Sequence, residues 1–574
     1  MDTASGYRQV IKPALINGVV MRQMVAVLIL LVCVVQCGAI RIIEFCPDPY
    51  LHDDADEYLV LSGTGSLDGI TVSDGEGGFR FPLGTMINGK VTIARDAIAF
   101  NKTHNRMPDY EWYDYSPVVT DVISGDKLRM ANSRDELMVY DHGALIQTVS
   151  WPKDVKPREG QVHYLEDGVW DQRPLLLGQS RFLIKAYKNV TVTTFVSPDN
   201  SNKVFLQAVA SANRTIHVNV YEFSSQVMAQ ALTDAHERGI DVSILVEGGP
   251  VGGISPEEKA VIWMMNQSGI PVYQMTAVGG QKAPYRFDHA KYLVIDNRAV
   301  LLTSENFKVS GFPPEGTRGN RGWGVYLEDT ETAQYFEDVF LSDIRSPGSI
   351  PISGTQGAPE PPSSVPYIPE FSSRRFLGAT VTPVISPDTS YVIHDLLNSA
   401  QGTIDIEQAY ITNESAYALN PYLATAINAS RRGVHVRVLL DAYWYNIEDE
   451  KDNDEMAALI NHIGIIEKIP LEAKCADLES NNLEKVHNKG VIVDNRSVLV
   501  SSINWNANSP NFNREAGVII ENMEVAQYFK EVFEDDWQPV RHTTARNFDY
   551  LKIAGLVVVV GGLITLYIWR RRRI

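Results

Sequence analysis

Short apolar runs separated by amphipathic segments recur along most of the chain. Residues 215–223 (TIHVNVYEF) and 403–411 (TIDIEQAYI) are β-rich, and each precedes an Ala-rich segment with helical spacing of its apolar positions. A second apolar run follows each of these segments, VSILVEG at 242–248 and VHVRVLL at 434–440. This alternation predicts an α/β fold with helices on both faces of a largely parallel or mixed sheet.

The same pattern is present twice. TVTTFVSPDNS at 191–201 matches TVTPVISPDTS at 380–390, and the offset of about 190 residues is far too long for a solenoid repeat. The sequence therefore predicts a duplicated domain, with copies at 179–345 and 375–540. Residues 346–374 between them are rich in Pro, Gly and Ser, so we expect an extended linker without packed elements.

A histidine and a lysine stand at the start of an otherwise apolar run in each copy. The runs are HAKYLVIDNRAVLLTSEN at 289–306 and HNKGVIVDNRSVLVSSIN at 487–504. Side chains of a strand alternate between its faces, so the histidine and the lysine share one face and the aspartate has the opposite parity. The repeated positions are His289, Lys291, Asp296, Ser304 and Asn306, and His487, Lys489, Asp494, Ser502 and Asn504. A lone histidine in an apolar strand is usually a core group, but duplication of the whole set indicates a functional site.

The pattern HxKxxxxD followed by Ser-x-Asn, present twice, resembles the phospholipase D superfamily over roughly residues 180–540. That resemblance implies two pseudo-symmetric phospholipase D-like α/β/α domains, each contributing half of one active site. The chain departs from the family pattern at Thr303 and Ser501, where the family usually has Gly before the Ser. NREAG in the second copy carries Glu515, whereas NRGWG in the first copy has Gly322 at that position.

Cleavage of a phosphodiester needs a nucleophile, a proton donor for the departing alcohol and positive charge around the phosphoryl oxygens. The resemblance implies a catalytic set of His289, Lys291, Asp296, His487, Lys489, Asp494 and Glu515. It also implies phosphate binding by Ser304, Asn306, Ser502 and Asn504. Within this set, we expect Asp296 and Asp494 to serve as structural or charge-balancing partners, not as catalysts.

The asymmetry between the copies predicts different roles for the histidines. In monomeric members of the superfamily, the acid after the second motif orients the histidine of the first motif. Carried over, Glu515 orients His289 as the nucleophile that becomes a phosphohistidine. His487 would then be the general acid without a carboxylate partner, because Gly322 replaces the acid.

The motifs allow two other interpretations. His and Asp are metal ligands, but the remaining donors are Lys and Asn, and a cationic lysine disfavours a divalent metal. We therefore predict no metal and no cofactor. A degenerate, non-catalytic scaffold is the second alternative, although no paired His, Lys or Asn position is lost.

The terminal segments predict a membrane-anchored protein. Residues 24–35 (MVAVLILLVCVV) have the pattern of a secretory signal within a segment at 1–39, cleaved after Ala39, with an uncleaved anchor as the alternative. Residues 553–569 form an apolar run of about 25 Å as a helix, followed by four arginines at 570–573. Arginine clusters stay cytoplasmic, so we expect a single-pass protein of the cell membrane with its catalytic body extracytoplasmic.

Residues 40–150 contain short alternating strands separated by Gly and Asp turns, which predicts an all-β immunoglobulin-like sandwich. EYLVLS at 57–62 and Leu67-Asp68-Gly69 resemble a lamin-tail-type domain, which implies a positioning or adhesive role. Of four cysteines, Cys46 and Cys475 lie outside the signal segment, so one long-range disulfide is compatible with the sequence.

The substrate class is less constrained than the chemistry. We expect a phospholipid substrate and membrane attachment through the C-terminal helix, with hydrolysis or phosphatidyl transfer of the cardiolipin-synthase-like kind, by a monomer. A formal net charge of −19 opposes binding of polyanionic DNA, yet a nuclease of the same superfamily remains an alternative. A non-catalytic lamin-tail adhesion protein is the other.

Overall fold

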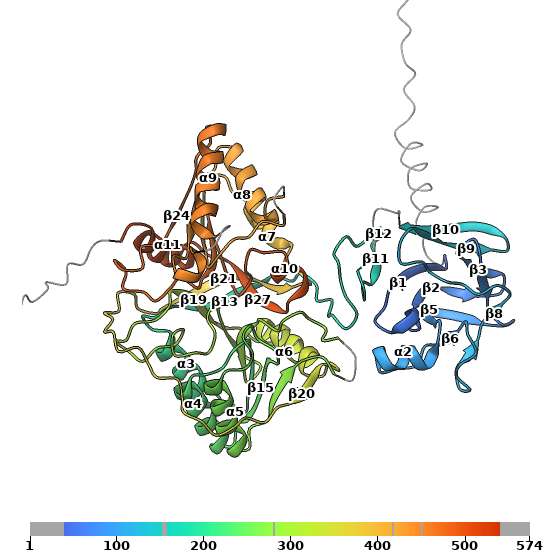
Figure 1. Ribbon diagram of the computed structural model, residues 1–574, viewed down its shortest axis with the longest axis horizontal. Coiled ribbons are helices and arrows are strands. Elements are labelled where there is room, and N and C mark those ends of the chain that lie inside the picture. Colours follow the sequence, from blue (N-terminus) through green and yellow to red (C-terminus); the bar gives the residue numbers. More distant parts are fainter. Residues whose placement is uncertain (1–38, 152–157, 279–281, 416–417, 449–451, 540–574) are drawn as a thin grey trace, which may run out of the picture. The chain divides into compact units, whose positions relative to one another are not determined.

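The computed structural model describes two compact units of the 574-residue chain (Figure 1). The described residues are 39–151, 158–278, 282–415, 418–448 and 452–539. The first unit extends to Ser180 and also includes Thr276–Tyr285 and Ser346–Gly348, and the second contains the other residues.

The predicted signal segment at 24–35 and the predicted transmembrane helix at 553–569 lie outside the described residues. Of the helices that the structure does describe, none is both long enough and apolar enough to span a bilayer. Cys46 and Cys475 are both free, so the structure does not contain the disulfide that the sequence allowed.

Two β-sheets enclose the core of the first unit. In the described residues, one sheet has the order β12 (Val169–Trp170), β11 (His163–Glu166), β1 (Arg41–Cys46), β2 (Tyr58–Ser66), β5 (Met86–Ala94), β6 (Tyr110–Glu111), β7 (Thr120–Asp121). The other has the order β10 (Ala144–Trp151), β9 (Asp135–Asp141), β3 (Ile70–Ser73), β4 (Gly78–Arg80), β8 (Ile123–Ser124). Leu61 of the first sheet and Val139 of the second belong to the same buried cluster, which confirms the predicted sandwich.

The first unit is not purely β, because residues Ala97–His104 form helix α2. The side chain of Asp96 accepts hydrogen bonds from the backbone N–H groups of Ile98 and Ala99, a standard helix start that the strand-rich surroundings obscured. The lamin-tail resemblance of this unit stays a prediction.

One mixed sheet runs through the second unit, and both copies of the repeat contribute to it. Its order in the described residues is β20 (Ser349–Pro351), β16 (Val272–Met275), β15 (Asp241–Glu247), β14 (Thr215–Val220), β17 (Lys291–Ile295), β18 (Ala299–Thr303), β19 (Gly322–Glu328), β13 (Tyr187–Ser197), β21 (Arg374–Ser386), β27 (Glu515–Glu521), β26 (Ser497–Ser501), β25 (Lys489–Val493), β22 (Thr403–Gln408), β23 (His435–Leu440), β24 (Leu471–Cys475). The antiparallel pair β13–β21 is central, and the strands on its two sides follow in equivalent order.

The two predicted α/β domains are therefore two halves of one continuous sheet, and we call them the first half and the second half. Strands β14, β15 and β16 are parallel, as are β22, β23 and β24, whereas the strands nearer the centre are antiparallel. The α/β class and the mixed sheet are as predicted.

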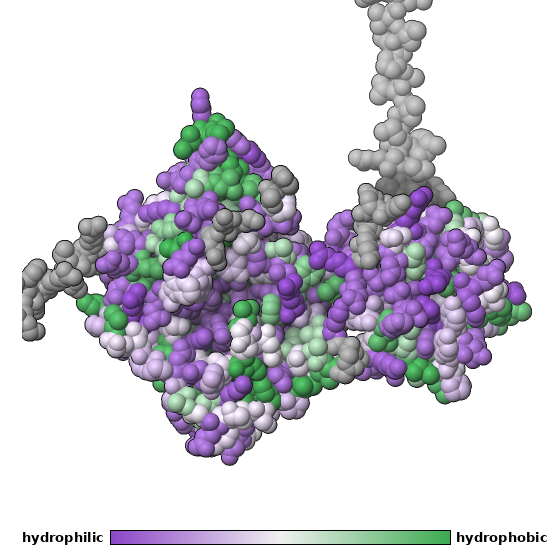
Figure 2. All heavy atoms as spheres, in the orientation of Figure 1, coloured by the Kyte–Doolittle hydropathy of each residue, from purple (hydrophilic) through white to green (hydrophobic). Residues whose placement is uncertain are grey.

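Helices cover both faces of this sheet (Figure 1). Those of the first half are α3 (Ser201–Ala210), α4 (Gln226–Glu237), α5 (Pro256–Gln267) and α6 (Thr330–Ile344), and those of the second half are α7 (Val392–Asn398), α8 (Pro421–Arg431), α9 (Asn453–Glu467), α10 (Ser509–Phe512) and α11 (Met523–Trp537). Leu293 of β17 packs in the same cluster as residues of α3, α4 and α5, whereas Tyr292, on the opposite face, packs at a tilt against Phe336 of α6. At the outer end of α9, Ile465 and Ile466 contribute to an exposed apolar patch (Figure 2).

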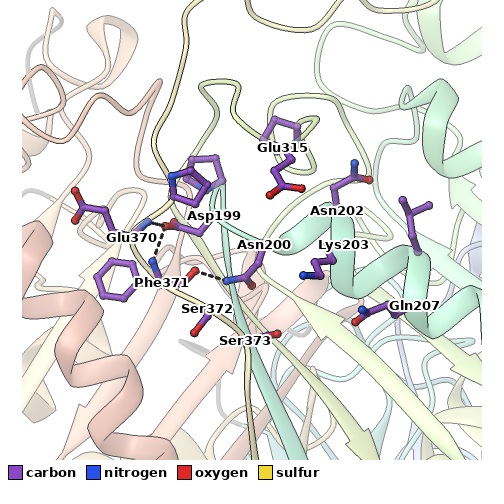
Figure 3. A pocket seen from close by; sticks show the side chains of 14 residues that line it. Asp199, Asn200, Asn202, Lys203, Gln207, Glu315, Glu370, Phe371, Ser372 and Ser373 are labelled. Atoms are coloured by element: carbon purple, nitrogen blue, oxygen red, sulfur yellow. Dashed lines mark hydrogen bonds between the residues drawn. The ribbon is translucent and has the colours of Figure 1, made fainter. Parts of the chain in front are cut away.

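The predicted linker packs closely against the first half, which corrects the expectation of an extended segment. Residues 349–351 form the edge strand β20, and Tyr367 is buried. Asp199 accepts hydrogen bonds from the Tyr367 hydroxyl and from the backbone N–H groups of Glu370 and Phe371. The amide of Asn200 donates to the Phe371 carbonyl, and the segment borders a pocket of about 560 Å³ (Figure 3). The Pro, Gly and Ser content predicted no packed element here, because composition alone does not reveal these apolar and aromatic anchors.

Candidate active site

Each motif histidine precedes a buried strand of the sheet and is held in place by the opposite half. The N–H of His289 donates to the Arg514 carbonyl at 2.8 Å, and the N–H of His487 donates to the Arg321 carbonyl at the same distance. Strands β17 and β25 follow directly, with all five residues of each buried. Because each half fixes the histidine of the other, the two motifs are parts of one composite site.

Glu515 reaches across from the second half to His289. Its Oε2 lies 2.8 Å from Nδ1 of His289 and accepts a 2.6 Å hydrogen bond from the Ser502 hydroxyl. The Ser509 hydroxyl and the Asn513 amide donate to Oε1. Burial raises the pKa of Glu515, but His289, Lys291 and these donors outweigh it, so the pKa lies below its usual value. Glu515 is therefore a carboxylate at neutral pH.

His487 also faces a carboxylate, contrary to the expectation that it lacks one. Oε1 of Glu305 lies 3.5 Å from Nδ1 of His487. Glu305 belongs to the Ser-x-Asn turn of the first half, so comparing the two copies at the position of Gly322 does not reveal it. Burial, followed by Lys489, Lys485 and Lys291, places the pKa of His487 well below the usual value.

The two motif lysines are completely buried beside the histidines. Nζ of Lys291 donates to the His289 carbonyl at 2.8 Å, and Nζ of Lys489 donates to the His487 carbonyl at 2.6 Å. Burial lowers the pKa of Lys291 to about 8 despite Glu515 and other acids, and burial with nearby Lys291 lowers that of Lys489 well below normal. An anionic phosphoryl group at this site would restore the balance of charge.

The structure separates the serines and asparagines expected to bind phosphate. The Ser502 hydroxyl donates to Glu515, and the Ser304 hydroxyl accepts from the backbone N–H of Trp323. Both serines are fully buried, and through these hydrogen bonds they hold neighbouring groups of the site in place. The Asn306 amide donates to Glu222 at 2.6 Å, while the Oδ1 atoms of Asn306 and Asn504 have no hydrogen-bond partner.

Asp296 and Asp494 lie just beyond the far ends of the motif strands, so a five-residue strand about 16 Å long separates each from its histidine. Asp296 accepts backbone N–H groups of residues 213–215 at 2.7 to 3.1 Å, and Asp494 accepts those of residues 401–403 at 2.7 to 2.9 Å. Partial burial raises their pKa values, but these bonds outweigh it and lower them. This placement gives both aspartates a structural role and does not bring them to the reacting groups.

Two buried arginines bind the halves together, and the sequence analysis assigned them no role. Arg321 lies between Asp199 of the first half and Asp536 of the second, with both carboxylates at 2.8 Å. Arg514 lies between Asp388 of the second half and Asp343 of the first, at 3.1 and 2.8 Å. The signal was present in the repeats, because SPD and NR recur in both copies.

Aromatic residues line the site beside the charged groups. The Tyr221 ring packs edge-on against His289 with centroids 4.6 Å apart, and Nζ of Lys291 lies 5.4 Å from the Tyr221 ring. On the other side, Nζ of Lys485 donates to the Tyr445 hydroxyl at 3.1 Å. Within the described residues, no group of three or more His, Cys, Asp or Glu side chains is arranged to hold a metal ion. The predicted independence from metal and cofactor stays a prediction.

A composite site of two histidines and two lysines, formed by matching halves of one sheet, defines the class of this protein. The chain matches the family model described as "Cardiolipin synthase, PLD-like domain" at residues 205–344 and 393–537. Phospholipase D of Rickettsia bellii is 32% identical over 150 residues, covering 26% of this chain and 67% of that protein. The chain belongs to the phospholipase D superfamily.

Two further similarities are more limited in extent. Mitochondrial cardiolipin hydrolase of Canis lupus familiaris is 30% identical over 128 residues, 22% of this chain, and the chain spans 44% of that protein's length. The crystal structure of phosphatidylserine synthase from Haemophilus influenzae Rd KW20 matches with 15% identity and a TM-score of 0.43, covering 61% of this chain and 86% of that one.

Proposed function

We propose that the protein is a membrane-anchored phosphodiesterase or phosphatidyltransferase that acts on phospholipids through a phosphohistidine intermediate. The observation that carries the proposal is the His289–Glu515 pair at 2.8 Å, supplied by opposite halves beside two buried lysines. A carboxylate on Nδ1 leaves the Nε2 lone pair of the imidazole available for attack on phosphorus.

In the first step, Nε2 of His289 forms a bond to phosphorus while the bond from phosphorus to the leaving alcohol oxygen breaks. His487 gives its proton to that oxygen, and Lys291 and Lys489 stabilise the negative charge on the phosphoryl oxygens. In the second step, water or another alcohol attacks phosphorus, gives its proton to His487 and releases His289. Water gives hydrolysis, and an alcohol gives phosphatidyl transfer.

Exposed apolar side chains near the site support a lipid substrate. Val251 is 81% exposed, and its N–H donates to Tyr221, the residue packed on His289. In the second half, Trp444 is 57% exposed and packs edge-on against Tyr445, which contacts Lys485. Aromatic side chains of this kind favour the boundary between water and lipid.

Anchoring by residues 553–569, with the catalytic body outside the cytoplasm, is part of the same proposal. It rests on the apolar run and the four arginines that follow it. The names of the similar proteins, cardiolipin hydrolase and phospholipase D, agree with a phospholipid substrate.

The test compares purified full-length protein on vesicles of labelled phospholipid and on plasmid DNA, with His289→Asn as the blank. We expect release of the labelled head group from vesicles, and an added primary alcohol should divert product if transfer competes with hydrolysis. Cleavage of DNA with no turnover of lipid would replace this proposal with the nuclease alternative. Inactivity on both substrates would contradict the enzymatic assignment.

A further inference from the structure

An unsatisfied pair of buried polar atoms lies at the second histidine. Nδ1 of His487 and Oε1 of Glu305 are 3.5 Å apart, and neither atom has a hydrogen-bond partner. A buried polar atom without a partner destabilises the fold, and a hydrogen bond between these two atoms would need a separation of about 2.7–3.2 Å. A small closure would satisfy both atoms, and catalytic hydrogen bonds commonly tighten when substrate binds.

Strand register identifies the counterpart of Glu515 in the first half. Glu515 pairs with Ser386 between β27 and β21, and Gly322 pairs with Ser197 between β19 and β13. Gly322 is thus the equivalent position, and it has no side chain. A Cβ at Gly322 would overlap the carboxylate and Cγ of Glu305, so the Glu305 side chain fills this space.

The supporting hydrogen bond is also repeated. The Asn513 amide donates to Oε1 of Glu515 at 3.0 Å, and the Asn320 amide donates to Oε2 of Glu305 at 3.0 Å. These two asparagines stand at the same place, two residues before Glu515 and Gly322. In the second half the position equivalent to Glu305 is Ile503, so each half has one acid, introduced from a different point of the chain.

We propose that Glu305 is the positioning residue of His487 and replaces, from the neighbouring turn, the acid missing at Gly322. Glu305 accepts the Nδ1–H of His487 in the reacting complex and stabilises the imidazolium, whose Nε2–H then points toward the leaving alcohol and supplies its proton. This assignment rests on the proposed phosphodiester chemistry of the site. It also replaces the expectation that His487 acts without a carboxylate.

The two carboxylates differ in a way that suits two different roles. Glu515 accepts from His289 and three further side chains, whereas the described contacts of Glu305 are Asn320 and His487. Burial raises the pKa of Glu305 against the opposing effect of Asn320 and the lysines, while the pKa of Glu515 is lowered. Glu515, the more readily ionised carboxyl group, therefore faces His289, which must carry a phosphoryl group and positive charge. Glu305, the less readily ionised one, faces His487, which must release its proton.

Leaving-group dependence tests the role of Glu305 in the full-length protein. With a phosphodiester of an alkyl alcohol, Glu305→Gln should lower kcat about 10²-fold with little change in KM. With a p-nitrophenyl ester, whose phenolate needs no proton, the loss should be under about fivefold. Glu315→Gln, a change at an exposed acid of the same half, is the control and should behave as wild type. Equal losses on both esters would overturn the proposal.

Moving the acid back provides a second test. Glu305→Ile introduces the residue type that the second half has at this position, Ile503. It should lower kcat on the alkyl ester by at least as much as Glu305→Gln does. Adding Gly322→Glu to Glu305→Ile should raise kcat on the alkyl ester at least tenfold, because the strand register places the new carboxylate at the position that Glu515 has in the second half. A double variant no more active than Glu305→Ile, with an unchanged melting temperature, would contradict the replacement.

The ¹⁵N resonances of labelled histidine report on His487 without any turnover. In complex with a phosphonate analogue of the substrate, we expect both ring nitrogens of wild-type His487 to be protonated and one of these protons to be lost in Glu305→Gln. An unchanged protonation state would refute the role of Glu305 even in an inactive protein. A wild type that turns over neither ester would instead contradict the proposed function, so the two failures are distinguishable.

Discussion

Replacing Glu515 by Gln removes one charge from the centre of the site and changes almost no volume. The carboxylate accepts from His289 and Ser502 on Oε2 and from Ser509 and Asn513 on Oε1. A glutamine has one acceptor oxygen and one amide group that only donates. Whichever way it is oriented, two of the four donors therefore face an N–H group in place of an acceptor.

The expected magnitude follows from these contacts. Each buried donor left without an acceptor costs about 1–3 kcal/mol, and rotation of the serine hydroxyls relieves part of that cost. Turnover should suffer more than stability, because His289 loses the partner that fixes its proton on Nδ1. Loss of tautomer control at a catalytic histidine costs about 10⁴-fold in a serine protease, so we expect kcat to fall about 10²- to 10⁴-fold.

The assay measures kcat and KM on a labelled phospholipid together with the melting temperature. Glu521→Gln, at the exposed far end of the same strand β27, is the matched control. The pKa of Glu515 is lowered in the folded state, so the stability it contributes is present above its unfolded value of about 4.3 and lost as pH falls through the folded value. The stability difference between wild type and Glu515→Gln should be constant near neutrality and shrink only on the acid side. A variant within threefold of wild-type kcat would refute the role given to Glu515.

Three other predictions follow from the site and its supports. Turnover should survive EDTA, because the proposed donors are His, Lys and Asn; loss of activity that zinc or calcium restores would contradict this. His289→Asn and His487→Asn should each abolish turnover, as should truncation within 346–374, and near-normal activity of any of them would show that the halves do not share one site. Arg321→Met leaves Asp199 and Asp536 buried without the guanidinium that both contact, so it should lower the free energy of unfolding in denaturant by about 3–5 kcal/mol. A decrease of less than about 1 kcal/mol would contradict the role of Arg321 in joining the halves.

The repeat and its motifs were visible in the sequence because they depend on local patterns. An apolar run that begins with His and Lys at alternate positions indicates a buried strand with a polar end, and β17 and β25 are such strands. The joining of both halves into one sheet depends on the pairing of β13 with β21, residues that lie nearly two hundred positions apart. No local pattern specifies such a pairing, so two separate domains were the natural expectation.

Charge burial was the second point that the sequence could not settle. Arginine is a residue type found mostly on protein surfaces, yet Arg321 and Arg514 are both buried between carboxylates. A charged residue is buried only when its partners are in place, and those partners come from the opposite half as well as its own. Their recurrence in SPD and NR was the available signal, but its meaning required the cross-half geometry.

The acid beside His487 shows why matching two copies position by position has a limit. The second copy places a glutamate in β27, and the first copy has Gly322 at the same register in β19. In an alignment of the two copies, the first copy therefore lacks the acid that Glu515 provides in the second. In space, Glu305 occupies the volume that the absent side chain leaves, and Asn320 donates to it as Asn513 donates to Glu515. A catalytic histidine is oriented by the position of a carboxylate oxygen, not by the backbone position that supplies it, so an acid can move between neighbouring segments while its role is kept.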